Sequence, residues 1–263
     1  MSENTQLRAR DRVETSGNAD AHKPITHRRG RAVGIVNTAQ EKERNSGPCL
    51  APGAVSVELA GVGHRFGARA VFKDIHARVE AGQTLVITGR NGSGKSTLLR
   101  ILAGLLPPAA GTVTVQVDGE TLDPVARRRA LGYVAPDLTL YRELTAAENL
   151  QFFARLRGIH LTREDLIAAL TEVGLRGRGR DLVGAYSSGM RQRLKYAFAL
   201  LTRPPILLLD EPTANLDVDG IAMVERILAA QRERPGGGLA VIATNEPREV
   251  EWGDTWIRLG AEG

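Results

Sequence analysis

The sequence predicts an α/β fold with a mainly parallel sheet, an N-terminal antiparallel β subdomain and a helical insertion. Three observations support this prediction. Short, wholly apolar runs alternate with helical patterns after residue 205, and such runs are typical of strands buried on both faces of a parallel sheet. Apolar and polar residues alternate from residue 55, which predicts strands with one exposed face. Helical periodicity dominates residues 145–201.

The composition indicates a globular chain. Of the 263 residues, 42% are hydrophobic and 25% are charged, which provides enough apolar material for a core. Cys49 is the single cysteine, so an internal disulfide is excluded. No run approaches about 18 consecutive apolar residues, and no secretory signal is recognisable, so we expect a cytoplasmic protein.

Residues 1–54 differ in composition from the rest. They hold nine Lys/Arg and six Asp/Glu, so they carry more than half of the net charge of +5. They are polar, Arg-rich and aperiodic, which predicts a disordered basic N-terminal extension; the alternative is an upstream start-site artefact. Because the predicted folded domain, residues 55–263, has nearly balanced charge, we expect no specific nucleic-acid partner.

Five extended runs and one helix are predicted before residue 135. The runs are 55–59, 72–79, 83–88, 112–117 and 131–134. The apolar run 83–88 indicates a buried strand, and the alternation in 112–117 indicates an edge hairpin. The helix spans 96–105, because Pro107 and Pro108 prevent its continuation.

Three helices are predicted in an insertion of about residues 137–202. Thr145 and Glu148 have the spacing of a capping box before the first, and Thr162 is placed to cap the second. The second and third helices span 161–175 and 187–201. Strand–helix alternation then resumes with a strand at 206–209, a helix at 221–232, a strand at 239–244 and a last strand near 256–259.

Residues 89–96 match the pattern G-x-x-x-x-G-K-[ST] between a predicted strand and a predicted helix. The pattern is typical of a P-loop, in which glycines let backbone N–H groups point at a phosphate chain. Lys95 is predicted to neutralise the β- and γ-phosphates and Ser96 to hold Mg²⁺; a structural Gly-rich turn is the alternative. The predicted nucleotide-binding residues of this segment are Gly89, Arg90, Asn91, Gly92, Ser93, Gly94, Lys95, Ser96 and Thr97.

Two acids, Asp210 and Glu211, follow the apolar strand 206–209. Ligands of α/β sheets bind at the carboxyl ends of strands. Neighbouring strand residues point to opposite sides, so the two acids need not share a role. Asp210 suits the Mg²⁺ shell, and Glu211 suits the orientation or deprotonation of an attacking water. Solvated strand-end acids are the alternative.

Ser187 and Gly189 open a predicted helix with one apolar face. A helix that starts with these residues is a second candidate phosphate site, with an ordinary helix cap as the alternative.

Taken with the P-loop and the acid pair, residues 55–263 resemble the ATP-binding-cassette (ABC) ATPases, which have a P-loop NTPase core. Phe66 corresponds to the aromatic residue that stacks on adenine in that family. The entry to the helical subdomain, the signature (typically L-S-G-G-Q) and the loop after the acid pair correspond to 144–150, 186–190 and 214–217.

The resemblance implies an ATP-driven dimer. In this family the signature of one subunit caps the γ-phosphate that the P-loop of the other subunit holds, so Ser187 and Gly189 are expected to act in trans. ATP and Mg²⁺ are the implied ligands. An ATP-dependent homodimer and an integral membrane transporter subunit are the implied partners, and the implied location is peripheral, at the cytoplasmic face of the inner (plasma) membrane.

Ser188 and Met190 depart from the typical signature, and two further positions depart from the family pattern. Pro136 stands where the family has a glutamine, and Asp137 follows it as a candidate substitute. Asn245 stands where the family has its switch histidine; an asparagine can hydrogen-bond a γ-phosphate but cannot carry a charge. We therefore expect slower hydrolysis than in members with the histidine.

Segments 133–137, 144–150 and 187–190 look most like haem-exporter ATPase subunits of cytochrome c maturation. The implied function is ATP hydrolysis that powers export through a separate membrane subunit. Export ATPases for a drug, a lipid or a polysaccharide are the close alternatives. A soluble ABC ATPase acting on nucleic acid or ribosomes, and a regulatory subunit with little hydrolysis, are further alternatives.

Overall fold

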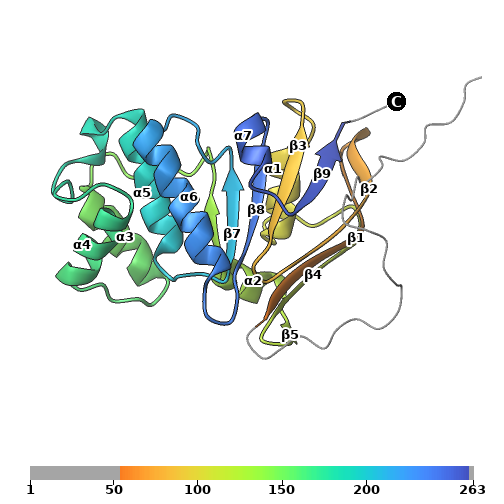
Figure 1. The fold of residues 1–263 in the computed structure, drawn as a ribbon, viewed down its shortest axis with the longest axis horizontal. Helices are drawn as coiled ribbons and strands as arrows, with labels where there is room; N and C mark the ends of the chain where they lie inside the picture. The colour runs from red at the N-terminus through yellow and green to blue at the C-terminus, as the bar shows by residue number, and fades with distance from the viewer. Residues whose placement is uncertain (1–53, 261–263) are drawn as a thin grey trace, which may run out of the picture. The chain divides into compact units, whose positions relative to one another are not determined.

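A computed structural model of the chain describes residues 54–260, which carry an antiparallel sheet and a parallel sheet with helices (Figure 1). The predicted extension, residues 1–54, lies outside the described residues except for Ala54, and so does Cys49. The division into that extension and a domain from 55 to 263, with a helical subdomain at about 137–202, stays a prediction. Within 54–260, no helix has the length and apolar character needed to cross a bilayer.

The antiparallel sheet has the strand order β2-β1-β4-β5. Its members are β1 (Val55–Phe66), β2 (Arg69–Glu80), β4 (Ala110–Val117) and β5 (Glu120–Thr121). Val55, Val57 and Leu59 of β1 are buried, as the period-2 pattern predicts, although Ser56 between them is buried as well. The β4–β5 hairpin forms one edge, which agrees with the expected edge hairpin.

The second sheet is wholly parallel, with the order β6-β7-β8-β3-β9. Its strands are β3 (Thr84–Gly89), β6 (Leu131–Val134), β7 (Ile206–Asp210), β8 (Leu239–Thr244) and β9 (Thr255–Leu259). Because all five strands run in the same direction, their carboxyl ends meet at one edge. The loops that follow β3, β6, β7 and β8 therefore gather there, and these loops carry the predicted site.

Each face of the parallel sheet has its own core. Leu85 and Ile87 of β3 pack on one face with α1 (Lys95–Leu102) and the antiparallel sheet, whereas Val86 faces the helices on the other. Those helices include α5 (Ser188–Leu200) and α6 (Val218–Arg232). This two-sided burial explains why the strands read as continuous apolar runs.

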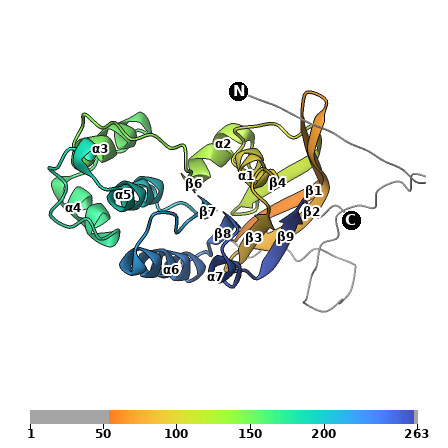
Figure 2. The ribbon, with the colours of Figure 1, turned by 90° about the horizontal axis from the view of Figure 1, so that it is seen from above.

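The helices of the insertion gather beside β6, at the end of the sheet away from β9 (Figure 2). Capping boxes start α3 (Ala146–Leu156) at Thr145 and α4 (Arg163–Glu172) at Thr162, as expected. A 3₁₀ turn, η1 (Val183–Ala185), precedes α5.

Two short helices were not expected from the sequence: α2 (Pro124–Ala130) and α7 (Pro247–Val250). Each has a proline in its first turn, a signal that could have identified both. The Asp123 side chain also caps α2 by accepting from the N–H groups of Val125 and Ala126.

Candidate nucleotide-binding and catalytic site

The loop between β3 and α1 requires glycine at two positions. Gly94 has φ 103°, and a Cβ there would lie 2.4 Å from Cγ1 of Val71. Gly89 has φ 147°, and a Cβ there would lie 2.4 Å from the carbonyl oxygen of Leu259. The backbone of the P-loop can take this path only without these side chains.

Lys95 is the first residue of α1, and only 6% of it is exposed. Its Nζ donates to the carbonyl of Gly89 at 2.8 Å and to Oδ1 of Asn245 at 3.0 Å. Burial lowers the pKa of Lys95, while the nearby carboxylates of Glu211 and Asp210 act in the opposite direction. A poorly hydrated ammonium group therefore lies where the loop turns into the helix.

Asp210 and Glu211 have different environments, although they are adjacent. Asp210 ends β7 and is 3% exposed. Burial raises its pKa, and a hydrogen bond with the Ser96 hydroxyl works against this rise. Glu211 is exposed, has φ 50° and donates its backbone N–H to the carbonyl of Ala243. The two neighbouring carboxylates therefore differ in their exposure to solvent.

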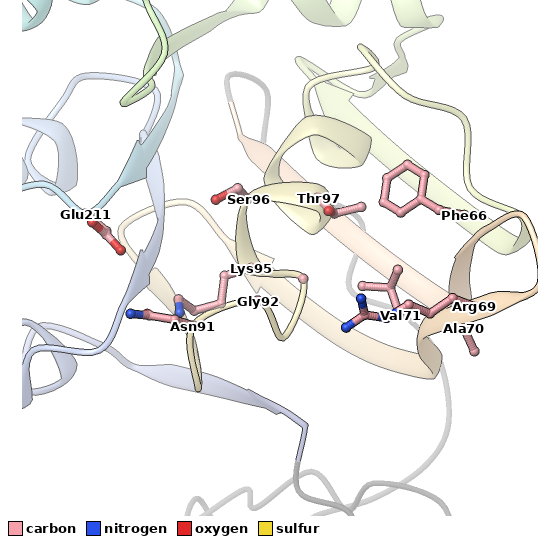
Figure 3. A pocket seen from close by; sticks show the side chains of 11 residues that line it. Phe66, Arg69, Ala70, Val71, Asn91, Gly92, Lys95, Ser96, Thr97 and Glu211 are labelled. Atoms are coloured by element: carbon pink, nitrogen blue, oxygen red, sulfur yellow. The ribbon is translucent and has the colours of Figure 1, made fainter.

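A hollow of about 510 Å³ connects the P-loop with Phe66 and Glu211 (Figure 3). Phe66 lies on one side and Glu211 on the other, with the start of α1 between them. The Phe66 ring is 55% exposed and meets His64 edge-on, with 4.8 Å between centroids. The remaining lining residues are Arg69, Ala70, Val71, Asn91, Gly92, Gly94, Lys95, Ser96 and Thr97.

Asn245 follows β8 and contacts the P-loop with both ends of its amide. Its Oδ1 accepts from Lys95, and its Nδ2 donates to Oδ1 of Asn91. The residue predicted at the switch position therefore lies against the residues predicted to bind phosphate.

The segment after β6 is held by two basic side chains that sequence reasoning missed. Arg100 of α1 pairs with the exposed carboxylate of Asp137 at 2.8 Å. Lys195 of α5 donates to the carbonyls of Ala135 at 3.0 Å and Pro136 at 2.7 Å. No motif marks either residue, because each contact depends on helices packing beside the strand end.

The start of α5 is exposed. Ser187 caps the helix, and its Oγ accepts from the N–H of Met190 at 3.1 Å. A Cβ at Gly189 would lie 2.9 Å from the carbonyl oxygen of Asn215, so this position favours glycine. The residues that line the hollow, taken from the described part of the chain, include none from 186–190.

A P-loop beside a strand-end acid pair, on a parallel sheet with a helical insertion, defines a P-loop NTPase. A family model described as "ABC transporter" matches residues 72–214. The chain belongs to this family. Two predictions from the sequence are thereby confirmed: the α/β fold class and the function as an ATP-hydrolysing subunit of an ABC transporter.

Within this family, the chain is similar to proteins named for cytochrome c biogenesis. The chain is 41% identical over 209 residues to the "Cytochrome c biogenesis ATP-binding export protein CcmA" of Rhodopseudomonas palustris, with 78% of this chain and 99% of the relative covered. It is 41% identical over 175 residues to the protein of the same name from Xanthomonas oryzae pv. oryzae, covering 66% of this chain and 79% of the relative.

A solved dimeric ATP-binding cassette in a post-hydrolysis state, bound to ADP and Pi, has the same fold. The TM-score is 0.67 at 27% identity, with 79% of this chain and 97% of that chain covered. A putative ABC transporter ATP-binding protein from Pyrococcus furiosus has a TM-score of 0.67 at 22% identity, which supports the fold alone.

Proposed function

We propose that this chain powers an export step of cytochrome c biogenesis and that the exported molecule is haem. The observation that carries the proposal is the 41% identity to CcmA of Rhodopseudomonas palustris, which extends over 99% of that relative. The relative therefore has no large part that this chain lacks. The choice of haem rests on likeness to the family and not on the geometry of a haem site.

The proposal is tested by deleting the gene in its own host and measuring covalently bound haem in c-type cytochromes. We expect the deletion to abolish these cytochromes, the wild-type gene to restore them, and the Lys95→Ala variant to fail. A normal set of c-type cytochromes in the deletion strain would contradict the proposal. A gain in sensitivity to drugs alone would favour the alternative of drug export.

The hollow beside the P-loop is the proposed ATP site. Phe66 offers an exposed ring for the adenine, and residues 89–97 wrap the phosphates with backbone N–H groups at the start of α1. Lys95 already lies at this point with a poorly hydrated ammonium group, so it can pair strongly with the β- and γ-phosphates.

Ser96 and Asp210 are the proposed holders of Mg²⁺. The Ser96 hydroxyl lies near enough to the buried Asp210 carboxylate to lower its pKa, and Lys95 lies near the same carboxylate. Mg²⁺ prefers oxygen ligands and takes only one or two from protein when phosphates and water supply the others, so this pair fits it. When bound, the ion neutralises charge that develops on the phosphates.

Glu211 is the proposed group that orients the attacking water. Its exposed carboxylate lines the hollow, and its backbone is left-handed with φ 50°. In the reaction, water oxygen attacks the γ-phosphorus, the bond to the bridging oxygen breaks, and ADP leaves. Asn245 would donate a hydrogen bond to the γ-phosphate from its position beside Lys95.

Asp137 remains a candidate for the missing glutamine, but its pairing with Arg100 gives it a second role. The ion pair connects the segment after β6 to the P-loop helix. Pro136 offers only its carbonyl, which Lys195 binds. We propose that this segment follows movements of α1 and α5 through these backbone and ionic contacts.

A second copy of the chain is the proposed source of Ser187 and Gly189. The exposed start of α5 offers N–H groups and a hydroxyl, and the hollow has none of these residues in its lining within 54–260. In the dimer, two such helix starts would each face the P-loop of the other copy. ATP between the copies then stabilises the closed state, and hydrolysis releases it.

An exposed aromatic surface on the insertion is the proposed contact with an integral membrane subunit at the cytoplasmic face of the inner membrane. Tyr141 and Phe152 are both exposed and meet edge-on at 5.2 Å, and exposed Leu156 lies on the same helix as Phe152. Aromatic anchors of this kind are enriched in interfaces.

The double variant Tyr141→Ala, Phe152→Ala tests this placement. Less of the membrane subunit should co-purify with the variant than with the wild type, while its ATP affinity should be unchanged. Equal co-purification would contradict the placement.

A further inference from the structure

Glu249 is a buried carboxylate that none of the sequence motifs includes. It lies in α7, which follows β8 after Asn245 and Glu246, and only 1% of it is exposed. Its Oε1 accepts from the backbone N–H of Thr213 at 3.0 Å and from the Thr213 hydroxyl. Its Oε2 is buried and has no hydrogen-bond partner in the described part of the chain.

A carboxylate in this position is costly for the fold. A buried oxygen without a partner loses its hydration and gains nothing in exchange. An apolar residue of similar size in α7 would avoid this loss, so stability alone does not explain a glutamate here. Through Oε1, the Glu249 side chain binds the segment that contains Thr213.

That segment begins with Glu211, which has φ 50°, and runs to Asn215, which has φ 64°. Both residues adopt a left-handed backbone that non-glycine residues rarely take, and such conformations persist only where the surroundings hold them. Hydrogen bonds hold three consecutive residues of this segment. The N–H of Glu211 donates to the carbonyl of Ala243, and the carbonyl of Pro212 accepts from Tyr196. The N–H of Thr213 donates to Glu249.

The side chain that binds Pro212 lies close to Glu249. Fully buried Tyr196 of α5 donates its hydroxyl to the Pro212 carbonyl at 2.9 Å. Burial, and then the charge of nearby Glu249, raise the pKa of Tyr196, so its hydroxyl stays protonated and remains a donor.

We propose that Glu249 is a positioning residue for ATP hydrolysis, which fixes the backbone of Glu211 through Thr213 and ties it to the loop that carries Asn245. The inference rests on the proposed catalytic role of Glu211. Asn245 is bound to Lys95 and Asn91 of the P-loop, and α7 follows it in the chain, so Glu249 connects the segment of Glu211 with the loop that carries Asn245. Loss of the carboxylate frees the segment and leaves the ATP-binding residues in place.

The test compares kcat and ATP affinity of the purified full chain. Glu249→Leu should lower kcat about 10- to 100-fold, because small displacements of reacting groups cost that much, and should change ATP affinity less than about twofold. Glu249→Gln keeps an oxygen that can accept from Thr213 and should retain most of the wild-type kcat. Exposed Glu251 lies two residues further on, and Glu251→Gln is the matched control with unchanged kcat.

A Glu249→Leu protein that is folded by circular dichroism and has wild-type kcat would overturn the inference. If that variant fails to fold, Glu249→Asp replaces it, because its shorter side chain does not reach Thr213; wild-type kcat would again overturn the inference. Failure of the proposed function has a different signature. In that case wild type and Glu211→Gln would hydrolyse ATP equally slowly, whatever residue stands at 249.

Discussion

Single side chains decide the chemistry of this site, and Lys95 is the clearest example. Its ammonium group is buried at the start of α1 and hydrogen-bonded to the loop that precedes it. The sequence was sufficient to predict the place of Lys95 in the fold, because the P-loop pattern lies between a strand and the helix that it starts. The same holds for Asp210, whose burial follows from its place at the end of an apolar strand.

Lys95→Ala should weaken ATP binding about 10- to 100-fold, the loss expected for a charge-assisted hydrogen bond. Isothermal titration calorimetry with a non-hydrolysable ATP analogue measures this. Lys73→Ala, at an exposed position of β2, is the matched control and should bind normally. An unchanged affinity of the Lys95→Ala variant would refute the phosphate role of this lysine.

Asn245→His should raise the steady-state rate of ATP hydrolysis. Asparagine contacts Lys95 and Asn91 here but carries no charge, whereas a histidine can share a proton with the γ-phosphate. The rates of the two proteins are compared at saturating ATP. If the variant is no faster, the amide is not the cause of slow turnover.

The contacts of Glu249, Arg100 and Lys195 could not be predicted in the same way. Each joins elements that are far apart in the sequence, such as α7 and the segment after β7. Their local patterns are those of ordinary surface residues. Only the packing of the helices around the strand ends reveals what these side chains bind.

At the scale of elements, periodicity and caps predicted most of the secondary structure. The apolar runs form the parallel strands, because burial on both faces favours apolar residues along most of their length. The capping boxes at Thr145 and Thr162 fixed the starts of α3 and α4. The short helices α2 and α7 were missed, because a four- or seven-residue helix has too few turns to show a period.

Thr145→Ala should destabilise the domain by about 1 kcal/mol at pH 7, the usual effect of losing an N-cap. Hydrogen bonds from Thr145 lower the pKa of Glu148 from 4.5. A carboxylate whose pKa is lower in the folded state than in the unfolded state stabilises the fold at pH values above its unfolded-state pKa. This stabilisation is lost as the pH falls through the folded-state pKa. Urea unfolding should therefore show a smaller difference between wild type and variant at pH 3 than at pH 7; an equal difference would contradict the coupling.

At the scale of the whole molecule, we propose that each copy of the chain contributes two different parts of an ATP site. One half is the hollow with its P-loop, and the other is the exposed start of α5. The resemblance to dimeric cassettes makes a second copy the natural complement. The sequence does not identify the transported molecule, because the motifs of the family lie at the ATP site and not on a surface that binds the cargo.

Glu211→Gln should bind ATP normally and remain as an ATP-bound dimer, because the amide preserves the shape of the site but cannot accept a proton from water. Light scattering with ATP and Mg²⁺ measures the mass. Lys95→Ala, which should lose the nucleotide, is the control and should stay monomeric. A Glu211→Gln protein that stays monomeric in ATP would contradict the dimer.

The central claim is that this ATPase works on a membrane subunit, and affinity purification from detergent-solubilised native membranes tests it most directly. The chain is recovered with its partners, which mass spectrometry identifies. We predict a polytopic membrane protein whose own sequence narrows the cargo. Recovery of soluble partners alone, or of ribosomes or DNA, would contradict the account.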